Sequence, residues 1–131
     1  MRQKKDNSLL TEVELEFMNA VWKIGNGTVR QVMQNLSPPR ALAYTSASTI
    51  MRILEQKKFL VSIKTEKSFV YSPTIDKADY QSKSLQHLSA KLFNNTPSSL
   101  VARLVDDENL SDDALQEIRN LLDRRLGKND T

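Results

Sequence analysis

The chain has 131 residues, a hydrophobic content of 39% and a net charge of +3, and it contains no cysteine. This length is enough to bury a core in one domain or in two small ones. No apolar run approaches the roughly 20 residues that a membrane-spanning helix needs, and the N-terminus lacks the apolar segment of a secretory signal. We therefore expect a cytoplasmic protein without disulfide bonds, thiolate metal sites or membrane insertion.

Charge is distributed unevenly along the chain. Residues 1–75 contain 11 Lys and Arg against 6 Asp and Glu, whereas residues 76–131 contain 8 against 10. An acidic partner such as nucleic acid would suit the first region, although a surplus of this size is also common on ordinary protein surfaces. The asymmetry suggests two regions with different tasks.

The first predicted helix follows a polar segment, residues 1–8, which we expect to be frayed. Thr11 and Glu14 have the spacing of a capping box, in which each side chain bonds the backbone amide of the other residue. Apolar residues then recur at helical spacing up to Ile24. The segment Gly25-Asn26-Gly27 is typical of a helix end followed by a turn.

A second and a third helix are predicted next, with a loop between them. Thr28 has the position of a cap for a short helix over residues 29–36, which Ser37-Pro38-Pro39 stops. The third helix covers about residues 45–57, with Thr45 as its cap. Its first turn is rich in small hydroxyl residues, which are mediocre helix formers, so these side chains serve either capping or contact with a partner.

The apolar residues of the third helix determine which of its side chains point outward. Four of them recur at positions i, i+3, i+4 and i+7 and should face the core, namely Ala47, Ile50, Met51 and Leu54. The outward side chains are then Thr45, Ser46, Ser48, Thr49 and Arg52. Hydroxyl groups can bond base edges or phosphates and an arginine can reach a guanine edge, so this face is typical of a DNA-reading helix. The competing interpretation is that these side chains cap the helix or are merely solvated.

Two short strands, residues 59–64 and 69–72, follow the third helix, and residues 65–68 join them as a tight hairpin. Three helices followed by a β-hairpin is the order of the winged helix-turn-helix, a common DNA-binding arrangement. Three cations could neutralise DNA phosphates in such a fold, namely Arg30 early in the second helix, Lys64 at the base of the hairpin and Lys67 at its tip. Each could equally be an ordinary solvated charge.

Residues 76–127 are predicted to form three more helices. The first covers about residues 76–93, the second begins at Pro97, and the third follows the capping residue Ser111. Short helices of this kind cannot enclose a large core alone. Their apolar stripes should pack against the first region or, as we favour, against a second chain. The residues assigned to this dimer interface are Leu85, Leu88, Leu92, Leu100, Val101, Leu104, Leu115, Ile118, Leu121 and Leu122.

The sequence offers no recognisable arrangement for catalysis or metal binding. The single histidine, His87, has no second histidine or cysteine with which to form a metal site. No pairing of a nucleophile with a general base is apparent either. We therefore expect no enzymatic activity, no metal and no cofactor.

Six segments form an ordered set: Leu10-Thr11-x-x-Glu14, Met18-x-x-Val21-Trp22, Thr28-Val29-Arg30-x-Val32, Ala43-Tyr44-Thr45, Phe69-Val70-Tyr71-Ser72-Pro73 and Leu110-Ser111-x-x-x-Leu115-x-x-Ile118-Arg119-x-Leu121-Leu122. Together they resemble the penicillinase-repressor family (BlaI/MecI/CopY type) of winged-helix transcriptional repressors. The resemblance implies a mainly α fold with a small β-hairpin wing. Residues 9–75 would form a winged-helix DNA-binding domain and residues 76–127 a helical dimerisation domain.

The resemblance also implies a function and a means of control. The chain would act as a homodimer that binds palindromic double-stranded operator DNA and represses antibiotic-resistance genes of the β-lactamase type, or related stress or metal-homeostasis genes. In penicillinase repressors of this type a pathway from a membrane sensor protease cuts an Asn-Phe bond, and the matching bond here is Arg103–Leu104. The reading helix also departs from the family pattern, with Thr45-Ser46-Ala47 for Thr-Thr-Val and Ile53 for Arg. The alternative function is a winged-helix module that binds another protein.

Overall fold

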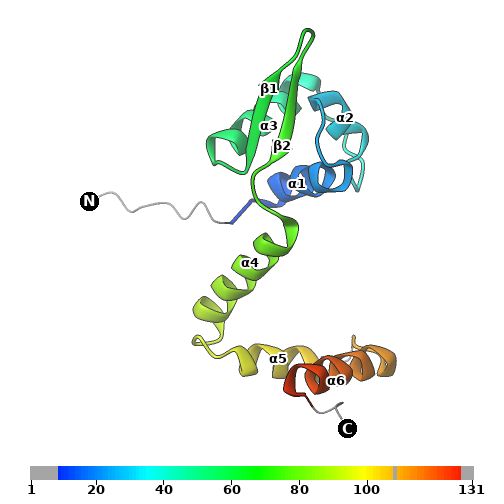
Figure 1. The fold of residues 1–131 in the computed structure, drawn as a ribbon, viewed down its shortest axis with the longest axis vertical. Coiled ribbons are helices and arrows are strands. Elements are labelled where there is room, and N and C mark those ends of the chain that lie inside the picture. Colours follow the sequence, from blue (N-terminus) through cyan, green and yellow to red (C-terminus); the bar gives the residue numbers. More distant parts are fainter. Residues whose placement is uncertain (1–8, 108, 128–131) are drawn as a thin grey trace, which may run out of the picture. The chain divides into compact units, whose positions relative to one another are not determined.

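A computed structural model describes residues 9–107 and 109–127 of the chain. The N-terminal segment that we expect to be frayed lies outside these residues. Within the described part, three helices and a β-hairpin are followed by three further helices (Figure 1), which confirms the predicted fold class. The chain divides into two compact units, one that extends to Leu85 and one that begins at Gln86. None of the helices in the described part is long and apolar enough to span a membrane.

Capping residues start the first two helices. Helix α1 (Glu12–Ile24) begins with the predicted box, in which the Thr11 hydroxyl accepts the Glu14 amide at 3.2 Å and Glu14 accepts the Thr11 amide at 2.9 Å. Helix α2 (Val29–Gln34) begins with a second box that we did not predict, formed by Thr28 and Gln31. Our boundary for α2 is wrong by two residues, because the chain leaves the helix at Asn35.

Helix α3 (Tyr44–Gln56) begins one residue earlier than predicted. Its N-cap is Ala43, which offers no side-chain hydrogen bond, so the prediction that Thr45 caps this helix is wrong. Ala43 already has the extended backbone of a cap, which puts Thr45 inside the first turn, where its carbonyl accepts the Thr49 hydroxyl at 3.0 Å. The predicted inward face is confirmed, since its four apolar residues belong to or pack against the core: Ala47, Ile50, Met51 and Leu54.

The hairpin pairs β1 (Leu60–Lys64) with β2 (Phe69–Pro73) in antiparallel register. As predicted, residues 65–68 form its turn, closed by a bond from the Thr65 amide to the Ser68 carbonyl at 2.7 Å. Gly27 and Tyr71 exchange two backbone hydrogen bonds of 3.0 and 2.8 Å, which anchor the hairpin beside the start of α2. A Cβ atom at position 27 would lie 2.8 Å from the tip of the Ile24 side chain, so a larger residue there would displace Ile24.

The core of the first unit lies between α1, α2, α3 and the hairpin and includes the start of α4 (Lys77–Leu92). Tyr80 of α4 is buried, with its ring centre 5.9 Å from those of both Trp22 and Phe59. Trp22 belongs to this packing, and its Nε1 donates to the Ile75 carbonyl at 2.9 Å. The first turns of α4 thus complete the first unit, and the domain division at residues 75 and 76 remains a prediction.

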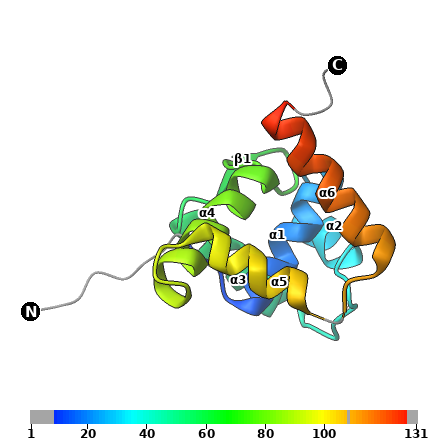
Figure 2. The same ribbon diagram turned by 90° about the horizontal axis from the view of Figure 1, so that it is seen from below.

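The second unit contains α5 (Pro97–Asp106) and α6 (Asp112–Leu126), which Figure 2 shows as separate helices. Ser111 caps α6 as predicted, because its hydroxyl accepts the Ala114 amide at 3.1 Å. Pro97 is the first residue of α5, also as predicted. No residue of these two helices is buried in the part of the chain that the structure describes.

A partly buried ion pair joins the start of α1 to the end of α3. The Glu14 carboxylate accepts two bonds from Lys57 Nζ, at 2.8 and 3.0 Å, in addition to the Thr11 amide. Burial by itself raises the pKa of Glu14, but the bonds from Lys57 and Thr11 outweigh it, so the pKa lies below its ordinary value. The charged carboxylate therefore fixes α3 against α1.

The substitution Glu14→Gln is expected to lower the free energy of unfolding by about 1–2 kcal/mol at neutral pH, because it removes the charge from these bonds. Since the folded pKa is lowered, the contribution of the carboxylate is complete above its ordinary value of 4.5 and is lost as the pH falls through the folded value. Urea unfolding of both proteins at stepwise lower pH measures this. A stability difference that persists at full size in acid would contradict it.

Candidate nucleic-acid interface

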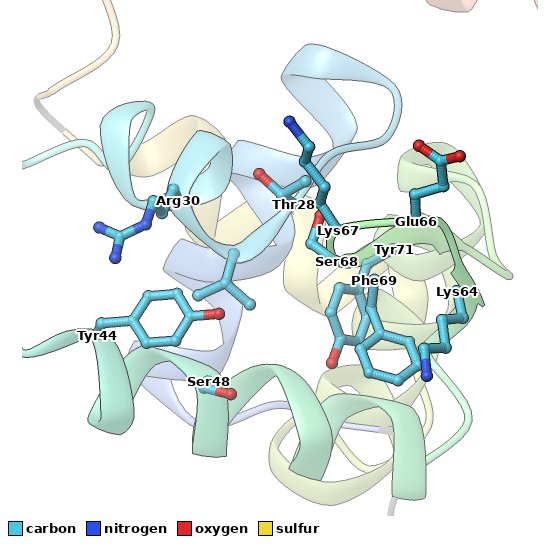
Figure 3. Close-up of a pocket in the computed structure, with 11 residues that line it drawn as sticks. Thr28, Arg30, Tyr44, Ser48, Lys64, Glu66, Lys67, Ser68, Phe69 and Tyr71 are labelled. Atoms are coloured by element: carbon cyan, nitrogen blue, oxygen red, sulfur yellow. The ribbon is translucent and has the colours of Figure 1, made fainter.

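A groove of about 570 Å³ lies between the start of α2, the start of α3 and the hairpin (Figure 3). Cations, hydroxyl groups and aromatic rings dominate its walls. The cations are Arg30, Lys64 and Lys67, the hydroxyl residues are Thr28, Ser48 and Ser68, and the aromatic residues are Tyr44, Phe69 and Tyr71. This combination suits an elongated anionic ligand, since the cations attract charge and the hydroxyl groups bond oxygen atoms.

The three cations reach the groove from separate elements. Arg30 is on α2, Lys64 ends β1 and Lys67 lies in the hairpin turn, and all three are exposed. Within the described residues none of them forms an ion pair with a carboxylate. Glu66 also borders the groove, but its carboxylate points away from it (Figure 3). The groove is therefore a positively charged surface whose cations are available to a ligand.

The structure turns the predicted face of α3 outward. Thr45, Ser46, Thr49 and Arg52 are exposed, while Ser48 is half-buried and lines the groove. Arg52 forms no ion pair with any described residue. Of the five side chains predicted to read DNA, Ser48 thus lines the groove together with the three predicted phosphate-binding cations, and the other four are exposed on the same helix of the first unit.

A carboxylate that we did not predict holds the hairpin to α3. Glu55 of α3 accepts both the amide and the hydroxyl of Ser62 in β1, at 3.2 and 2.8 Å. Ser62 lies opposite Tyr71 in the hairpin. Burial raises the pKa of Tyr71, and the neighbouring Glu55 raises it further, so its phenol stays protonated at neutral pH. Helix and hairpin therefore form one braced surface.

Sequence reasoning missed the three aromatic residues of this surface, Tyr44, Phe69 and Tyr71. Tyr44 is the first residue of α3, and its ring lies under the Arg30 guanidinium at 4.7 Å. The available signal for Tyr44 in the sequence was its place directly before the hydroxyl-rich start of the predicted third helix. Tyr71 gave none, since alternation in a short strand does not show which face packs against a helix.

The apolar residues predicted for dimerisation form exposed stripes. Seven of them are between 42% and 67% exposed, namely Leu85, Leu88, Leu92, Val101, Leu104, Leu121 and Leu122. Leu100, Leu115 and Ile118 are half-buried. The bond between Arg103 and Leu104 lies inside the regular helix α5, with both side chains exposed. No group of three His, Asp or Glu side chains gathers into a metal site among residues 9–107 and 109–127.

Comparison with known proteins gives consistent matches over most of the chain. A family model described as penicillinase repressor matches residues 10–124. The chain is 26% identical over 119 residues to the penicillinase repressor of Bacillus licheniformis, covering 91% of this chain and 93% of that protein. It is 25% identical over 116 residues to the methicillin resistance regulatory protein MecI of Staphylococcus aureus (strain Mu50), covering 88% and 94%. The solution structure of the DNA binding domain of the repressor BlaI matches with a TM-score of 0.50 and 30% identity, over 59% of this chain and 94% of that chain.

Proposed function

The chain belongs to the penicillinase repressor family, and from this premise we propose that it represses transcription by binding operator DNA through the groove face of its first unit. The observation that carries the proposal is the groove in which three cations, from α2, β1 and the hairpin turn, lie with Ser48 of the hydroxyl-rich helix α3. Duplex DNA offers phosphates and base edges at the spacing of such a surface. The chain would therefore act where chromosomal DNA is, in the cytoplasm.

In this proposal α3 lies in the major groove and the hairpin lies along the backbone. The base-facing residues are Thr45, Ser46, Ser48, Thr49 and Arg52, and the phosphate-facing residues are Arg30, Lys64 and Lys67. The bonds of Glu14 with Lys57 and of Glu55 with Ser62 support it, since they hold the reading helix in place before DNA arrives. A preorganised surface loses less conformational entropy on binding.

We further propose that the second unit forms a homodimer through its exposed apolar stripes. Large apolar surfaces of this kind are seldom left open to water. A twofold dimer would present two α3 helices to a palindromic operator, with half-sites one duplex turn or a multiple apart. Sedimentation of the chain without DNA should give the mass of two chains, and the mass of one chain at all concentrations would exclude the dimer.

DNase footprinting of the purified chain on the DNA upstream of its own gene tests the proposed function. We expect one protected region with a twofold-symmetric sequence and a loss of protection at high salt. If no upstream DNA is protected at low salt, the repressor function fails and the winged unit is better explained as a protein-binding module. A neighbouring gene for a β-lactamase or a sensor protease would support control of antibiotic resistance.

Control by a sensor protease is a separate part of the proposal. The cut bond would be Arg103–Leu104, within α5, or another bond of the second unit. Immunoblots of induced cells should then show a shortened chain, and an intact chain after full induction would exclude this route. The proposed DNA binding does not depend on the outcome.

The substitution Lys67→Ala is expected to lower the slope of log affinity against log salt concentration by about one, because one phosphate contact is lost. The effect should be the same on operator and random DNA, since phosphates carry no sequence information. Fluorescence anisotropy over a series of salt concentrations measures the slope. Lys83→Ala is the control, since Lys83 is exposed on α4 and lies outside the groove. An unchanged slope for Lys67→Ala would remove Lys67 from the interface.

A further inference from the structure

Arg30 and Tyr44 form a cation–π pair at one end of the groove. The Arg30 guanidinium carbon lies 4.7 Å from the centre of the Tyr44 ring. Arg30 is the second residue of α2 and Tyr44 is the first residue of α3, so the pair bridges the two helices of the helix-turn-helix. Figure 3 shows the guanidinium beside the ring, with the Tyr44 hydroxyl directed into the groove.

Nothing else in the described residues accounts for the position of Arg30. The side chain is exposed, and no described carboxylate forms an ion pair with it. A cation in the first turn of a helix also gains no stabilisation from the helix dipole. Arg40 provides the contrast, because both its Nε and Nη2 donate to the Glu16 carboxylate and its charge is already paired. The Tyr44 ring is thus the feature that orders the Arg30 side chain.

Tyr44 likewise has no evident part in stability. It is 43% exposed, and it does not belong to the core cluster. Its hydroxyl makes no hydrogen bond within the described part of the chain. The Tyr44 ring is exposed, and it contacts an arginine of the neighbouring helix. Its role is therefore better explained by its effect on the orientation of Arg30.

The geometry leaves the arginine ready for a second partner. The guanidinium carbon lies over the Tyr44 ring, and its N–H groups bond no described carboxylate, so they can meet two oxygen atoms of a phosphate. An arginine side chain that is free in solution loses rotamer entropy when it is fixed, and the contact with Tyr44 already meets part of that loss. Arg30 is therefore oriented before a phosphate arrives.

We propose that Tyr44 is a positioning residue for DNA binding, which holds Arg30 so that it receives one backbone phosphate at the junction of α2 and α3. The inference rests on the proposed DNA-binding function and names the two residues that would fix the DNA backbone at this junction. Neither residue touches a base in this arrangement, so the contact adds affinity on every DNA sequence equally.

The test uses the full chain with four variants: Tyr44→Leu, Tyr44→Phe, Arg30→Ala and the double variant Arg30→Ala/Tyr44→Leu. Binding to a random-sequence duplex and to the upstream DNA is followed by fluorescence anisotropy as salt is varied. Tyr44→Leu should weaken binding to both DNAs about two- to fivefold, the factor that corresponds to an exposed cation–π contact. Tyr44→Phe keeps the ring and should bind like the wild type. Arg30→Ala should lower the salt slope by about one.

The double variant decides between positioning and direct contact. If Tyr44 acts through Arg30, Tyr44→Leu has no further effect once Arg30 is alanine, whereas independent losses that multiply would overturn the inference. Equal losses of DNA affinity for Tyr44→Phe and Tyr44→Leu would assign the effect to the Tyr44 hydroxyl and overturn the inference. Unchanged DNA binding by Tyr44→Leu would also overturn it. Arg40→Ala is the matched control, because it removes an arginine that is paired with Glu16 and lies outside the groove. Thermal unfolding by circular dichroism should be the same for Tyr44→Leu and the wild type.

The two DNAs separate this inference from the proposed function. A wild-type chain that binds the random duplex but prefers no upstream sequence would end the repressor function, while the effect of Tyr44 could still be judged on the random duplex. A wild-type chain that binds neither DNA at low salt would overturn both. Wild-type binding to both DNAs, with Tyr44→Leu unaffected, would overturn the positioning role alone.

Discussion

Replacing Arg52 with alanine is expected to weaken operator binding by about 1–3 kcal/mol, roughly 5- to 150-fold, with little change in stability. Arg52 lies on the exposed face of α3 and forms no ion pair with a described residue, so its guanidinium is available to a guanine edge. A base contact is lost only on the correct sequence. Binding to random DNA should therefore fall much less than binding to the operator, and anisotropy titrations on both DNAs give the ratio.

Arg52→Lys is the matched variant for this prediction. Lysine keeps the positive charge but loses the planar pair of donors that reads a guanine. Compared with Arg52→Ala, the variant Arg52→Lys should bind random DNA like the wild type but should still bind the operator more weakly than the wild type. If Arg52→Ala reduces binding to both DNAs by the same factor, Arg52 is a phosphate contact and the operator is read by other residues of α3.

Replacing Met51 with alanine is expected to lower the free energy of unfolding by about 2–5 kcal/mol, the range for a buried methionine. Met51 precedes Arg52 in α3, yet its side chain is fully buried in the core of the first unit. The substitution leaves a cavity between α3 and its neighbours. Urea unfolding should show a lower midpoint with an unchanged slope, because the surface exposed on unfolding is nearly the same.

Met51→Leu controls for volume and should reduce stability by less than about 1.5 kcal/mol. Arg52→Ala controls for position, since it alters an exposed side chain of the same helical turn. A loss for Met51→Ala no larger than that for Arg52→Ala would show that α3 does not pack as described. Together the two sites separate the folding role of α3 from its reading role.

Local sequence signals were sufficient to predict most helix starts and the orientation of α3. The box of Thr11 with Glu14 and the cap at Ser111 each act within three residues, so they form once the chain turns helical. The inward face of α3 follows from a spacing of three and four residues. The family resemblance extended this reading to a winged-helix repressor, and the comparisons confirm the family.

The local capping signal failed at the start of α3. Thr45 is a good capping residue by type, but the helix begins at Tyr44 because the extended backbone at Ala43 already satisfies the geometry of a cap. The hydroxyl of Thr45 is thereby left on the outer face of α3. Residue preferences at a cap differ by only about 1 kcal/mol, which the packing of a whole helix easily exceeds.

The bonds that brace the proposed interface join residues distant in the sequence, and only the tertiary structure reveals them. Glu14 illustrates the difference, since its bond to Thr11 was predictable from a three-residue spacing, whereas its partner Lys57 is 43 residues away. The contact of Arg30 with Tyr44 likewise forms only when α2 and α3 are packed together. Capping and periodicity act within one or two helical turns, so the sequence was enough to indicate which face of α3 is exposed. The groove beside that face exists because the core holds α2, α3 and the hairpin together.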